Sequence, residues 1–301
     1  MDEQILLQHA LKFLVECEYD CRNVLFETLA EKLSIPHTQL EQLLRDLRAA
    51  NLIEPDSFVL TVEGREYALH VLQAHRLYET YLARKTGVPE SSWHILADAK
   101  EHELSESDVQ KLSEELGNPR FDPHGDPIPN AMGQMPARQG RLLTDYPVGW
   151  AGRVVHIEDE PPRLYAFIAK AGIAPDTLLR IEHKDSRQIK IYTEGRTFNF
   201  PLETAEQITA VELTDGEIFD DSIERLSGLQ PGQEADILGL SPLCRGLERN
   251  RLLDLGFVPG TRISIELVNP SGNPIGYGIR GACIALRLDQ AERIRIRKVN
   301  Q

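Results

Sequence analysis

The feature that most constrains the fold of this chain is a segment that occurs twice in its second half. The sequence AKAGIAPDTLLRIE at 169–182 matches LDLGFVPGTRISIE at 253–266, with a glycine, a proline and a threonine at the same spacing in both copies. Each copy combines a short helical pattern, a glycine turn and several short alternating runs, which is typical of a small β-barrel. The repeat therefore predicts two such barrels in tandem in the second half of the chain.

The first part of the chain has helical rather than alternating periodicity. Apolar residues recur at helical spacing in ILLQHALKFLVE, in VLFETLAEKL and, after a break at 34–36, in HTQLEQLLRDLRAANLIE. A short alternating run at 57–61 predicts a brief strand or hairpin. Three helices followed by such a wing describe a winged helix-turn-helix domain at 1–73, although a plain three-helix bundle would give similar periodicity.

A second helical region extends from about residue 62 to residue 118, and a stretch rich in proline and glycine, 118–130, ends it. Residues 131–146 show little periodicity. We interpret them as a linker between the helical part of the chain and the first barrel.

Metal-capable side chains are concentrated in the second helical region. Four of them occur in WHILADAKEHELS: His94, Asp98, Glu101 and His102. Offsets of four, seven and eight keep them within about one third of the circumference of a helix, so they can converge on one ion. His75 and Glu79 form a second pair at helical spacing. Imidazole and carboxylate without thiolate suit a divalent ion such as Mn²⁺, Fe²⁺ or Zn²⁺, and a solvated helix face is the alternative.

Composition limits the class of protein. The chain has 301 residues, enough for two or three domains, and its 41% hydrophobic and 27% charged residues are ordinary for a globular protein. No stretch approaches the ~18 apolar residues of a membrane span, and the acidic N-terminus does not resemble a secretory signal. We expect a cytoplasmic protein without membrane insertion. Its four cysteines are too few for a disulfide framework.

The charge distribution bears on nucleic acid as a partner. The formal net charge is -14; residues 1–73 hold 6 Lys+Arg against 13 Asp+Glu, whereas residues 226–301 hold 10 against 7. An acidic protein repels phosphate at long range, so generic affinity for nucleic acid is not expected, although a local basic face could still exist.

Motifs of common enzymes are absent from the sequence. It contains no HExxH zinc motif, no glycine-rich phosphate loop and no nucleophile elbow. Catalytic zinc sites also need an open coordination position with a base nearby. We therefore expect no enzymatic activity.

Taken together, residues 5 to about 130 resemble the metal-dependent repressors of the diphtheria-toxin-repressor and manganese-transport-regulator family. The resemblance depends on LAEKLSIPHTQLEQLLRDLRAANLI, LTVEGREYALHVLQAHRLYETYL, HILADAKEHELS and NPRFDPHGDPIP, which occur in this order. It implies a multi-domain α+β protein with a helical metal-binding and dimerisation domain at 74–130. Residues 147–213 resemble the family's SH3-like barrel, and residues 226–301 resemble a FeoA-like domain, itself an SH3-like barrel.

The resemblance also implies two metal sites. The primary site would take one ligand from the first helix and three from a later one: His9, Asp98, Glu101 and His102. The ancillary site would consist of His75, Glu79 and His94. The absence of sulfur favours Fe²⁺ or Mn²⁺ as the cofactor, although ligand type alone does not select among divalent metals. Lys12 stands where manganese regulators carry a carboxylate, which favours iron.

The function that the resemblance implies is repression of metal-uptake genes by a metal-loaded homodimer. An ion that joins the first helix to the dimer core would fix the angle between them and favour one orientation of the helix-turn-helix. The two recognition helices, 37–49, would then enter successive major grooves of double-stranded operator DNA. The residues expected to face the groove are Thr38, Gln39, Gln42 and Arg45.

A second hypothesis is a metal-sensing interaction protein that does not bind DNA. In this reading the FeoA-like domain docks on a ferrous-iron transport protein, and the motive is the pairing of an acidic first domain with a basic last one. Asp46 and Asp56 lie in or beside the helix-turn-helix, where phosphate contacts would be made. DNA binding should therefore be weak or require metal.

Overall fold

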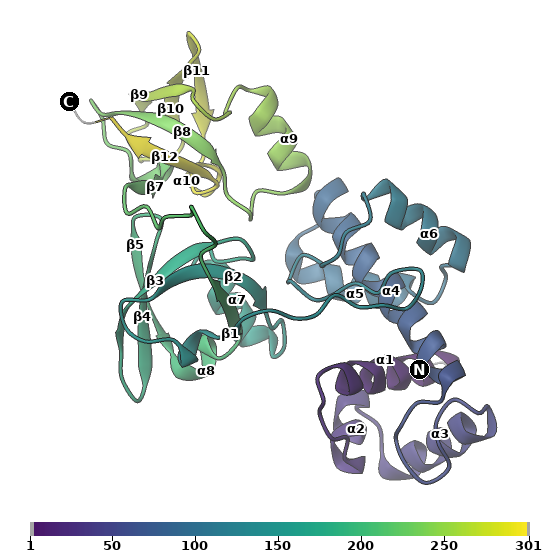
Figure 1. Cartoon of the computed structure of the whole chain (residues 1–301). Coiled ribbons are helices and arrows are strands. Elements are labelled where there is room, and N and C mark those ends of the chain that lie inside the picture. Colours follow the sequence, from purple (N-terminus) through teal and green to yellow (C-terminus); the bar gives the residue numbers. More distant parts are fainter. Residues whose placement is uncertain (1–2, 300–301) are drawn as a thin grey trace. The chain divides into compact units, whose positions relative to one another are not determined.

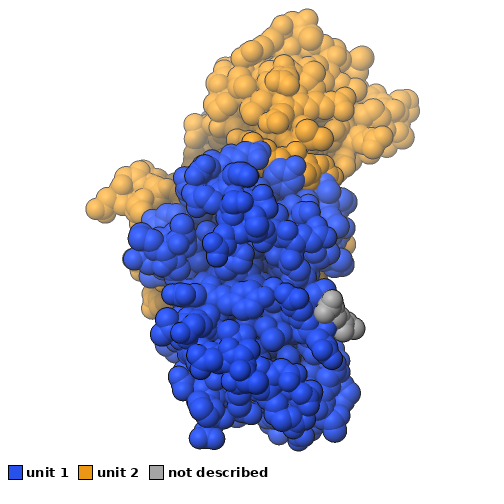
Figure 2. Space-filling model, turned by 90° about the vertical axis from the view of Figure 1, so that its right-hand side faces the viewer, with its two compact units in different colours: residues 1–83, 88–122, 126–137 blue, residues 84–87, 123–125, 138–301 orange. Residues whose placement is uncertain are grey.

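The computed structural model describes residues 3–299. Its contacts divide the chain into two compact units (Figure 2). Unit 1 comprises Met1–Ala83, Val88–Asp122 and Asp126–Ala137, and unit 2 comprises Arg84–Gly87, Pro123–Gly125 and Arg138–Gln301. Each unit contains hydrophobic cores of its own. Within residues 3–299, no helix combines the length and the apolar character that crossing a membrane requires.

Unit 1 is helical (Figure 1). Its helices are α1 (Glu3–Tyr19), α2 (Phe26–Leu33), α3 (His37–Ala49), α4 (Val62–Lys85, whose last two residues belong to unit 2), α5 (Trp93–Lys100) and α6 (Glu106–Glu115). The bounds of α3 are those predicted from the sequence. Four leucines at helical spacing bury one face of it in a core shared with α1 and α2: Leu40, Leu43, Leu44 and Leu47. The opposite face stays exposed.

The wing predicted at 57–61 is reduced to a single pair of bridged residues, Ile53 and Leu60. Beside them, the Glu54 backbone N–H donates to the Val59 carbonyl at 2.9 Å. Residues 55–58 are turn and bend, and Pro55 has no N–H to contribute to a strand ladder. Too few residues are left on either side for a regular strand.

The second helical region is less continuous than its periodicity predicts. α4 ends shortly before Pro89, and α5 ends at Lys100. α6 starts afresh from Ser105, whose hydroxyl accepts a hydrogen bond from the Asp108 backbone N–H in a capping box. The predicted domain boundary at 73 falls inside α4, so the first two domains share one unbroken helix.

Unit 2 contains two six-stranded antiparallel sheets (Figure 1). The first has the order β1-β6-β2-β3-β4-β5 and consists of β1 (Arg141–Leu142), β2 (Ala151–Ile157), β3 (Leu178–Lys184), β4 (Gln188–Thr193), β5 (Arg196–Pro201) and β6 (Ile208–Glu212). The second has the order β11-β10-β9-β8-β12-β7 and consists of β7 (Ile223–Arg225), β8 (Glu234–Leu240), β9 (Arg262–Val268), β10 (Ile275–Ile279), β11 (Ala282–Leu286) and β12 (Ile294–Lys298).

Helices occupy equivalent places in the two sheet domains. α7 (Pro162–Lys170) and α9 (Gly246–Asp254) each lie between the second and third strands, and α8 (Leu202–Ala205) and α10 (Leu288–Ala291) precede the last strand. Read from opposite ends, the two strand orders are the same. The predicted fold class, a helical N-terminal part followed by two small β domains, is confirmed.

Glycines of the repeat stand where the backbone requires them. Gly172 and Gly256 have φ angles of 81° and 94°, and Gly195 and Gly281 both have a φ of 81°. Residues with a Cβ rarely adopt this left-handed region. The same turns in both copies explain why the glycine spacing of the repeat is visible in the sequence.

The predicted linker at 131–146 extends too far. Arg141 and Leu142 form β1, which pairs with β6, and Leu143 and Tyr146 are buried in the core of the first sheet domain. A strand of only two residues is too short to show alternation, so no pattern in the sequence indicated β1. The second sheet domain likewise begins at Ile223 rather than at 226.

Candidate metal centre

The metal ligands predicted from the sequence come from three helices of unit 1. α1 carries one, α4 carries two that are one turn apart, and α5 with the turn after it carries the rest: His9; His75 and Glu79; His94, Asp98, Glu101 and His102. They do not converge on one point. Within unit 1 they form three overlapping groups, and in each group the ligand atoms lie within 4.8 Å of one another.

The first group consists of His9, Glu101 and His102. Glu101 Oε1 lies 3.6 Å from His9 Nε2 and 3.7 Å from His102 Nε2, and the two imidazole nitrogens are 3.2 Å apart. Two ligand atoms that are each about 2.1 Å from one ion lie about 3.0 to 3.5 Å apart at tetrahedral or octahedral angles. The triangle therefore fits a divalent transition metal.

The second group consists of His75, Glu79 and His94. Glu79 Oε1 lies 3.3 Å from His75 Nε2 and 3.4 Å from His94 Nδ1, and the two rings meet edge to face with centroids 4.9 Å apart. Glu79 and His75 are buried, whereas the side chain of His94 is 48% exposed. These distances also fit an ion, with His94 on the solvent side.

Asp98 does not join the first group, although it was predicted in the primary site. Its Oδ1 lies 3.3 Å from His75 Nδ1 and 2.8 Å from Lys12 Nζ, and its Oδ2 lies 3.4 Å from His94 Nε2. Asp98 is still on α5, one turn after His94, and faces α4. The residues that follow lie beyond the end of the helix, where the chain turns toward His9.

Lys12, on α1, occupies the middle of the cluster. Its Nζ lies 2.8 Å from Asp98 Oδ1, 3.0 Å from Glu101 Oε2 and 3.3 Å from His75 Nδ1, and its side chain is only 13% exposed. The three residues around it are the third metal-capable group. Sequence reasoning used Lys12 only as a hint about the choice of metal, because the sequence does not place the end of its side chain.

The charges around them keep Asp98 and Glu101 ionised. Burial raises the pKa of both carboxyls. Hydrogen bonds from His75 and the charge of Lys12 lower the pKa by more than burial raises it, so the net pKa of each lies below its usual range. For His75, burial and Lys12 lower the pKa, while Glu79 and the two other carboxylates raise it more; the net value is well above the usual one. A metal ion at His75 therefore has to displace a proton.

The two imidazoles of the first group are predisposed to bind metal. Burial lowers the pKa of His9, and the charge of Lys12 lowers it further. Burial also lowers the pKa of His102. Both rings are therefore predominantly neutral at pH 7, which is the form that ligates metal.

Gln8 orients His102, and sequence reasoning missed it. His102 Nδ1 contacts Gln8 Oε1, and Gln8 Nε2 donates a hydrogen bond to the Tyr67 hydroxyl at 2.5 Å. An amide oxygen accepts, so the imidazole proton lies on Nδ1, and Nε2 presents its lone pair toward Glu101. The available signal was a polar residue on the apolar side of α1, next to His9.

The donor chemistry of the cluster fits a divalent ion of borderline to hard character. The three groups contain only imidazole nitrogens and carboxylate oxygens, which suit Mn²⁺ and Fe²⁺ as well as Zn²⁺. The carboxylates of Glu79, Asp98 and Glu101 contribute three negative charges, and the ammonium of Lys12 offsets one of them. A divalent cation would balance the remainder.

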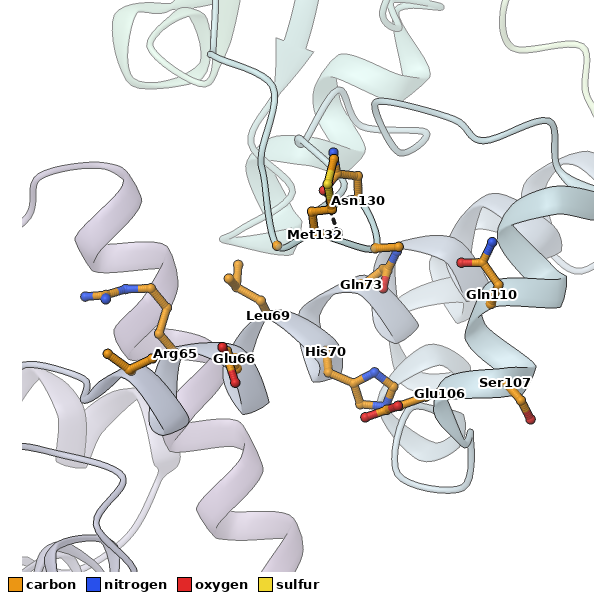
Figure 3. A pocket seen from close by; sticks show the side chains of 13 residues that line it. Arg65, Glu66, Leu69, His70, Gln73, Glu106, Ser107, Gln110, Asn130 and Met132 are labelled. Carbon is orange, nitrogen blue, oxygen red and sulfur yellow. Dashed lines mark hydrogen bonds between the residues drawn. The ribbon is translucent and has the colours of Figure 1, made fainter.

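A groove of about 880 Å³ is a separate feature of unit 1 (Figure 3). Side chains of α4, such as Arg65, Leu69 and Gln73, line one wall, and Glu106 and Gln110 of α6 line another. The groove residues include none of the seven predicted metal ligands. The cluster, rather than this groove, is the candidate metal centre.

The four residues predicted to face a DNA groove are all exposed on α3: Thr38, Gln39, Gln42 and Arg45. Arg45 Nη2 donates to Gln42 Oε1 at 2.8 Å, and Gln42 Nε2 donates to Asp46 Oδ1 at 2.8 Å. The face is thus polar and suited to base edges. The carboxylate of Asp46 on the same face reduces its positive charge.

Comparisons with known proteins match two separate parts of the chain to families related to metal regulation or transport. Residues 61–130 match the family described as iron dependent repressor, metal binding and dimerisation domain, and residues 224–298 match the FeoA domain family. The iron-dependent repressor IdeR of Mycobacterium leprae is 31% identical over 149 residues, which cover 45% of this chain and 64% of that protein. A probable metal transport system membrane protein of Chlamydia pneumoniae is 43% identical over 77 residues, 26% of this chain and 17% of that protein.

Solved structures extend the likeness over more of the chain. A manganese-dependent transcriptional repressor in complex with manganese is 30% identical, and the match covers 68% of this chain and 100% of that one with a TM-score of 0.62. The manganese regulator SloR, 22% identical with a TM-score of 0.58, has the same fold over 69% of this chain. The chain therefore belongs to the diphtheria-toxin-repressor family of metal-dependent repressors, and it carries a FeoA domain.

Proposed function

We propose that this chain is a metal-dependent repressor of transcription, which binds double-stranded operator DNA in the cytoplasm as a homodimer when it is loaded with Fe²⁺ or Mn²⁺. The observation that supports this most directly is the composition of the first group. His9 comes from α1, whereas Glu101 and His102 follow α5, and their ligand atoms lie 3.2 to 3.7 Å apart.

The proposal requires that the first group controls the position of α3. α1 shares one hydrophobic core with α2 and α3, to which Leu11, Leu29 and Leu40 contribute as fully buried residues. A bound ion would supply a crosslink between the two sides of the group. His9 then holds α1, and with it α3, while Glu101 holds the chain after α5, so that one orientation of the reading helix is favoured.

DNA binding is expected to be weak without metal. The first 73 residues have seven more acidic than basic side chains, from 13 Asp+Glu and 6 Lys+Arg. Most nonspecific affinity for DNA comes from cationic contacts with phosphate, and few are available here. Base contacts from Gln42 and Arg45, held in register by the loaded cluster, would have to supply the specificity.

The proposal is tested by fluorescence anisotropy with a duplex from the region upstream of the chain's own gene, at low salt and without oxygen. We expect at least tenfold tighter binding with Mn²⁺ or Fe²⁺ than with chelator. Glu101→Ala and His102→Ala should remove the difference, whereas His70→Ala, which replaces a histidine outside the cluster, should retain it. Equal binding with metal and with chelator would contradict the proposal.

The FeoA domain supports a second candidate partner, a ferrous-iron transport protein. Residues 226–301 carry more basic than acidic side chains, 10 against 7, and could dock on an acidic partner surface. Co-purification of the full chain with such a transporter under reducing conditions tests this role. No association in the presence of Fe²⁺ would exclude it, and the DNA-binding experiment is independent of the result.

A further inference from the structure

Lys12 is an unexpected residue at the centre of a metal-capable cluster. Its ammonium group lies 2.8 to 3.3 Å from atoms of His75, Asp98 and Glu101, and its side chain is 13% exposed. Removing an ammonium group from water is unfavourable unless anions compensate for the lost hydration. Asp98 and Glu101 provide that compensation, so the lysine is held where a cation is stabilised.

The position that Lys12 fills is one that an ion could use. Without the lysine, His75, Asp98 and Glu101 offer one nitrogen and two carboxylates to a common point. A metal ion would lie about 2.0 to 2.2 Å from such atoms, inside the space that the ammonium nitrogen occupies. Ion and ammonium group therefore exclude each other from this point.

The position is also special because it lies between the two other groups. It shares Glu101 with the first group and His75 with the second. An ion there would bind through the same carboxylate as an ion at His9, and the two ions would be bridged. With Lys12 in place, the first and second groups stay separate.

Charge leads to the same conclusion as geometry. Metal binding displaces the proton of His75. With the imidazoles neutral, Glu79, Asp98 and Glu101 carry three negative charges and Lys12 carries one positive charge, which leaves two negative charges to match one divalent ion. Without Lys12 the cluster would still have a negative charge after binding one ion. That charge favours a further cation at the vacated position.

We propose that Lys12 is a specificity-determining residue of the metal centre: its ammonium group is a tethered cation that fills the position between His75, Asp98 and Glu101 and keeps a divalent ion out of it. The inference rests on the metal binding that the proposed function requires, but not on DNA binding. Lys12 thereby limits the number of ions per chain and prevents a bridged pair.

The test replaces the charge in the full chain with Lys12→Met and measures bound Mn²⁺ by equilibrium dialysis and elemental analysis. We expect the variant to bind one more Mn²⁺ per chain than the wild type. Its electron paramagnetic resonance spectrum should change from that of isolated ions to that of an exchange-coupled pair, because Glu101 would bridge them. Lys12→Gln provides the same test if the methionine variant does not fold.

Two control variants test whether the number of bound ions depends on a positive charge at position 12 in particular. Lys12→Arg keeps a cation at the same place and should bind as many ions as the wild type. Lys100→Met removes a lysine of the same region that is paired with Glu103 at the surface, and it should also leave the number unchanged. Uncoupled ions in wild-type number in both Lys12→Met and Lys12→Gln would overturn the inference.

The same measurements distinguish a failure of this inference from a failure of the proposed function. A wild type that binds neither Mn²⁺ nor Fe²⁺ contradicts metal-dependent repression. If Lys12→Met then binds Mn²⁺, the inference about Lys12 still stands, whereas a Lys12→Met variant that also binds neither ion rejects both. A wild type that binds Mn²⁺, with Lys12→Met indistinguishable from it, rejects the inference alone.

Discussion

Some side chains of the metal centre contact several neighbours at once, and His75 is the clearest case. Its Nε2 lies 3.3 Å from Glu79, while its Nδ1 lies 2.5 Å from Glu101 and 3.3 Å from Lys12. One nitrogen cannot donate to a carboxylate and accept from an ammonium group at the same time. With Lys12 in place the shorter contact decides: Nδ1 donates to Glu101, and Nε2 is the nitrogen that would bind a metal ion once its proton is lost.

Gln8 leads to a prediction about metal affinity. Gln8→Ala removes the acceptor that holds the proton of His102 on Nδ1, so the ring can rotate and Nε2 no longer points steadily at the ion. Loss of such an orienting partner typically weakens metal binding about 10-fold to 100-fold. Competition with a chelating dye measures the affinity.

The matched control for this prediction is Gln39→Ala, which removes an exposed glutamine of α3, away from the cluster. It should bind Mn²⁺ like the wild type. If Gln8→Ala also binds like the wild type, Gln8 does not orient His102 in the loaded protein.

At the residue scale the sequence predicts the types of ligand better than their directions. His75 and Glu79 are one turn apart on a helix, and the structure brings them together with His94, as the resemblance implies. The direction of Asp98 depends on α5 ending at Lys100, and periodicity does not fix helix ends that closely. The ammonium position of Lys12 depends on rotatable bonds, which leave no trace in the sequence.

Among the elements, helices were predictable where leucines mark a buried face, as on α3, whereas the alternation at 57–61 predicted a longer wing than the one observed. A strand is recognised by alternation over several residues. The alternating run here has only five residues, and residues 55–58 form turn and bend, so a single bridge between Ile53 and Leu60 remains. Next to this bridge, the backbone of Leu52 lies close against Gly64, in the first turn of α4. A Cβ added there would lie 1.9 Å from the Leu52 carbonyl oxygen.

Gly64→Ala is therefore predicted to destabilise the protein. Glycine to alanine inside a helix normally stabilises by about 1 kcal/mol, because the backbone of alanine loses less entropy. Here the overlap with Leu52 reverses the sign, and overpacking of this kind costs about 1 to 3 kcal/mol. Calorimetry should show a thermal midpoint lowered by at least about 3 °C for unit 1.

Gly87→Ala is the control for this substitution. Its added Cβ would meet only the Leu247 side chain at 3.7 Å, an ordinary contact, and Gly87 does not have a left-handed backbone conformation. Its midpoint should stay close to that of the wild type. A Gly64→Ala midpoint equal to or above the wild type would show that the wing moves away without loss.

At the scale of the whole molecule, a buried ion pair joins the two sheet domains of unit 2. Arg225, at the end of β7, forms a salt bridge with Glu194, in the turn between β4 and β5, and both side chains are buried. Arg225 also donates to the carbonyl oxygens of Glu292 at 2.6 Å and Gly172 at 3.3 Å. The pair thus connects the two copies of the repeat.

Two substitutions of Glu194 are predicted to separate the loss of its polar group as a partner of Arg225 from the loss of the carboxylate charge alone. Glu194→Leu leaves the Arg225 charge buried without its carboxylate, which costs about 3 kcal/mol or more. Glu194→Gln keeps an acceptor for Arg225 and should cost less than about 1 kcal/mol. Chemical denaturation of the full chain measures both, with the exposed Glu203→Gln as a neutral control.

The shifted pKa of Glu194 determines how the stability of the protein changes with pH. Burial raises the pKa of Glu194, and Arg225 lowers it less than burial raises it. The folded chain therefore holds the proton more tightly than the unfolded chain, so the contribution of Glu194 is largest below its unfolded pKa and falls as pH rises through the folded pKa. Wild type should lose stability relative to Glu194→Gln as the pH rises above the unfolded pKa of glutamate, about 4.3, and a difference that does not change with pH would contradict the shifted pKa.

The repeat made the two sheet domains predictable, whereas their connection was not. The matched segments contain the glycine turns and the alternating strands of both copies, and these fixed the fold class. Arg225 lies between the two predicted barrels, in a stretch that neither copy of the repeat includes. A long-range pair of opposite charges has no local pattern that sequence reasoning could use.

The unbroken course of α4 also makes it a lever. Gly64, under the wing, and His75, in the metal cluster, are eleven residues apart on this helix, which is about 16 Å along its axis. A tilt of about 5° at His75 would displace the wing end by about 1.5 Å, half the length of a hydrogen bond. A movement that hardly disturbs the bonds to an ion is thus large enough to align or misalign a helix with the edges of base pairs.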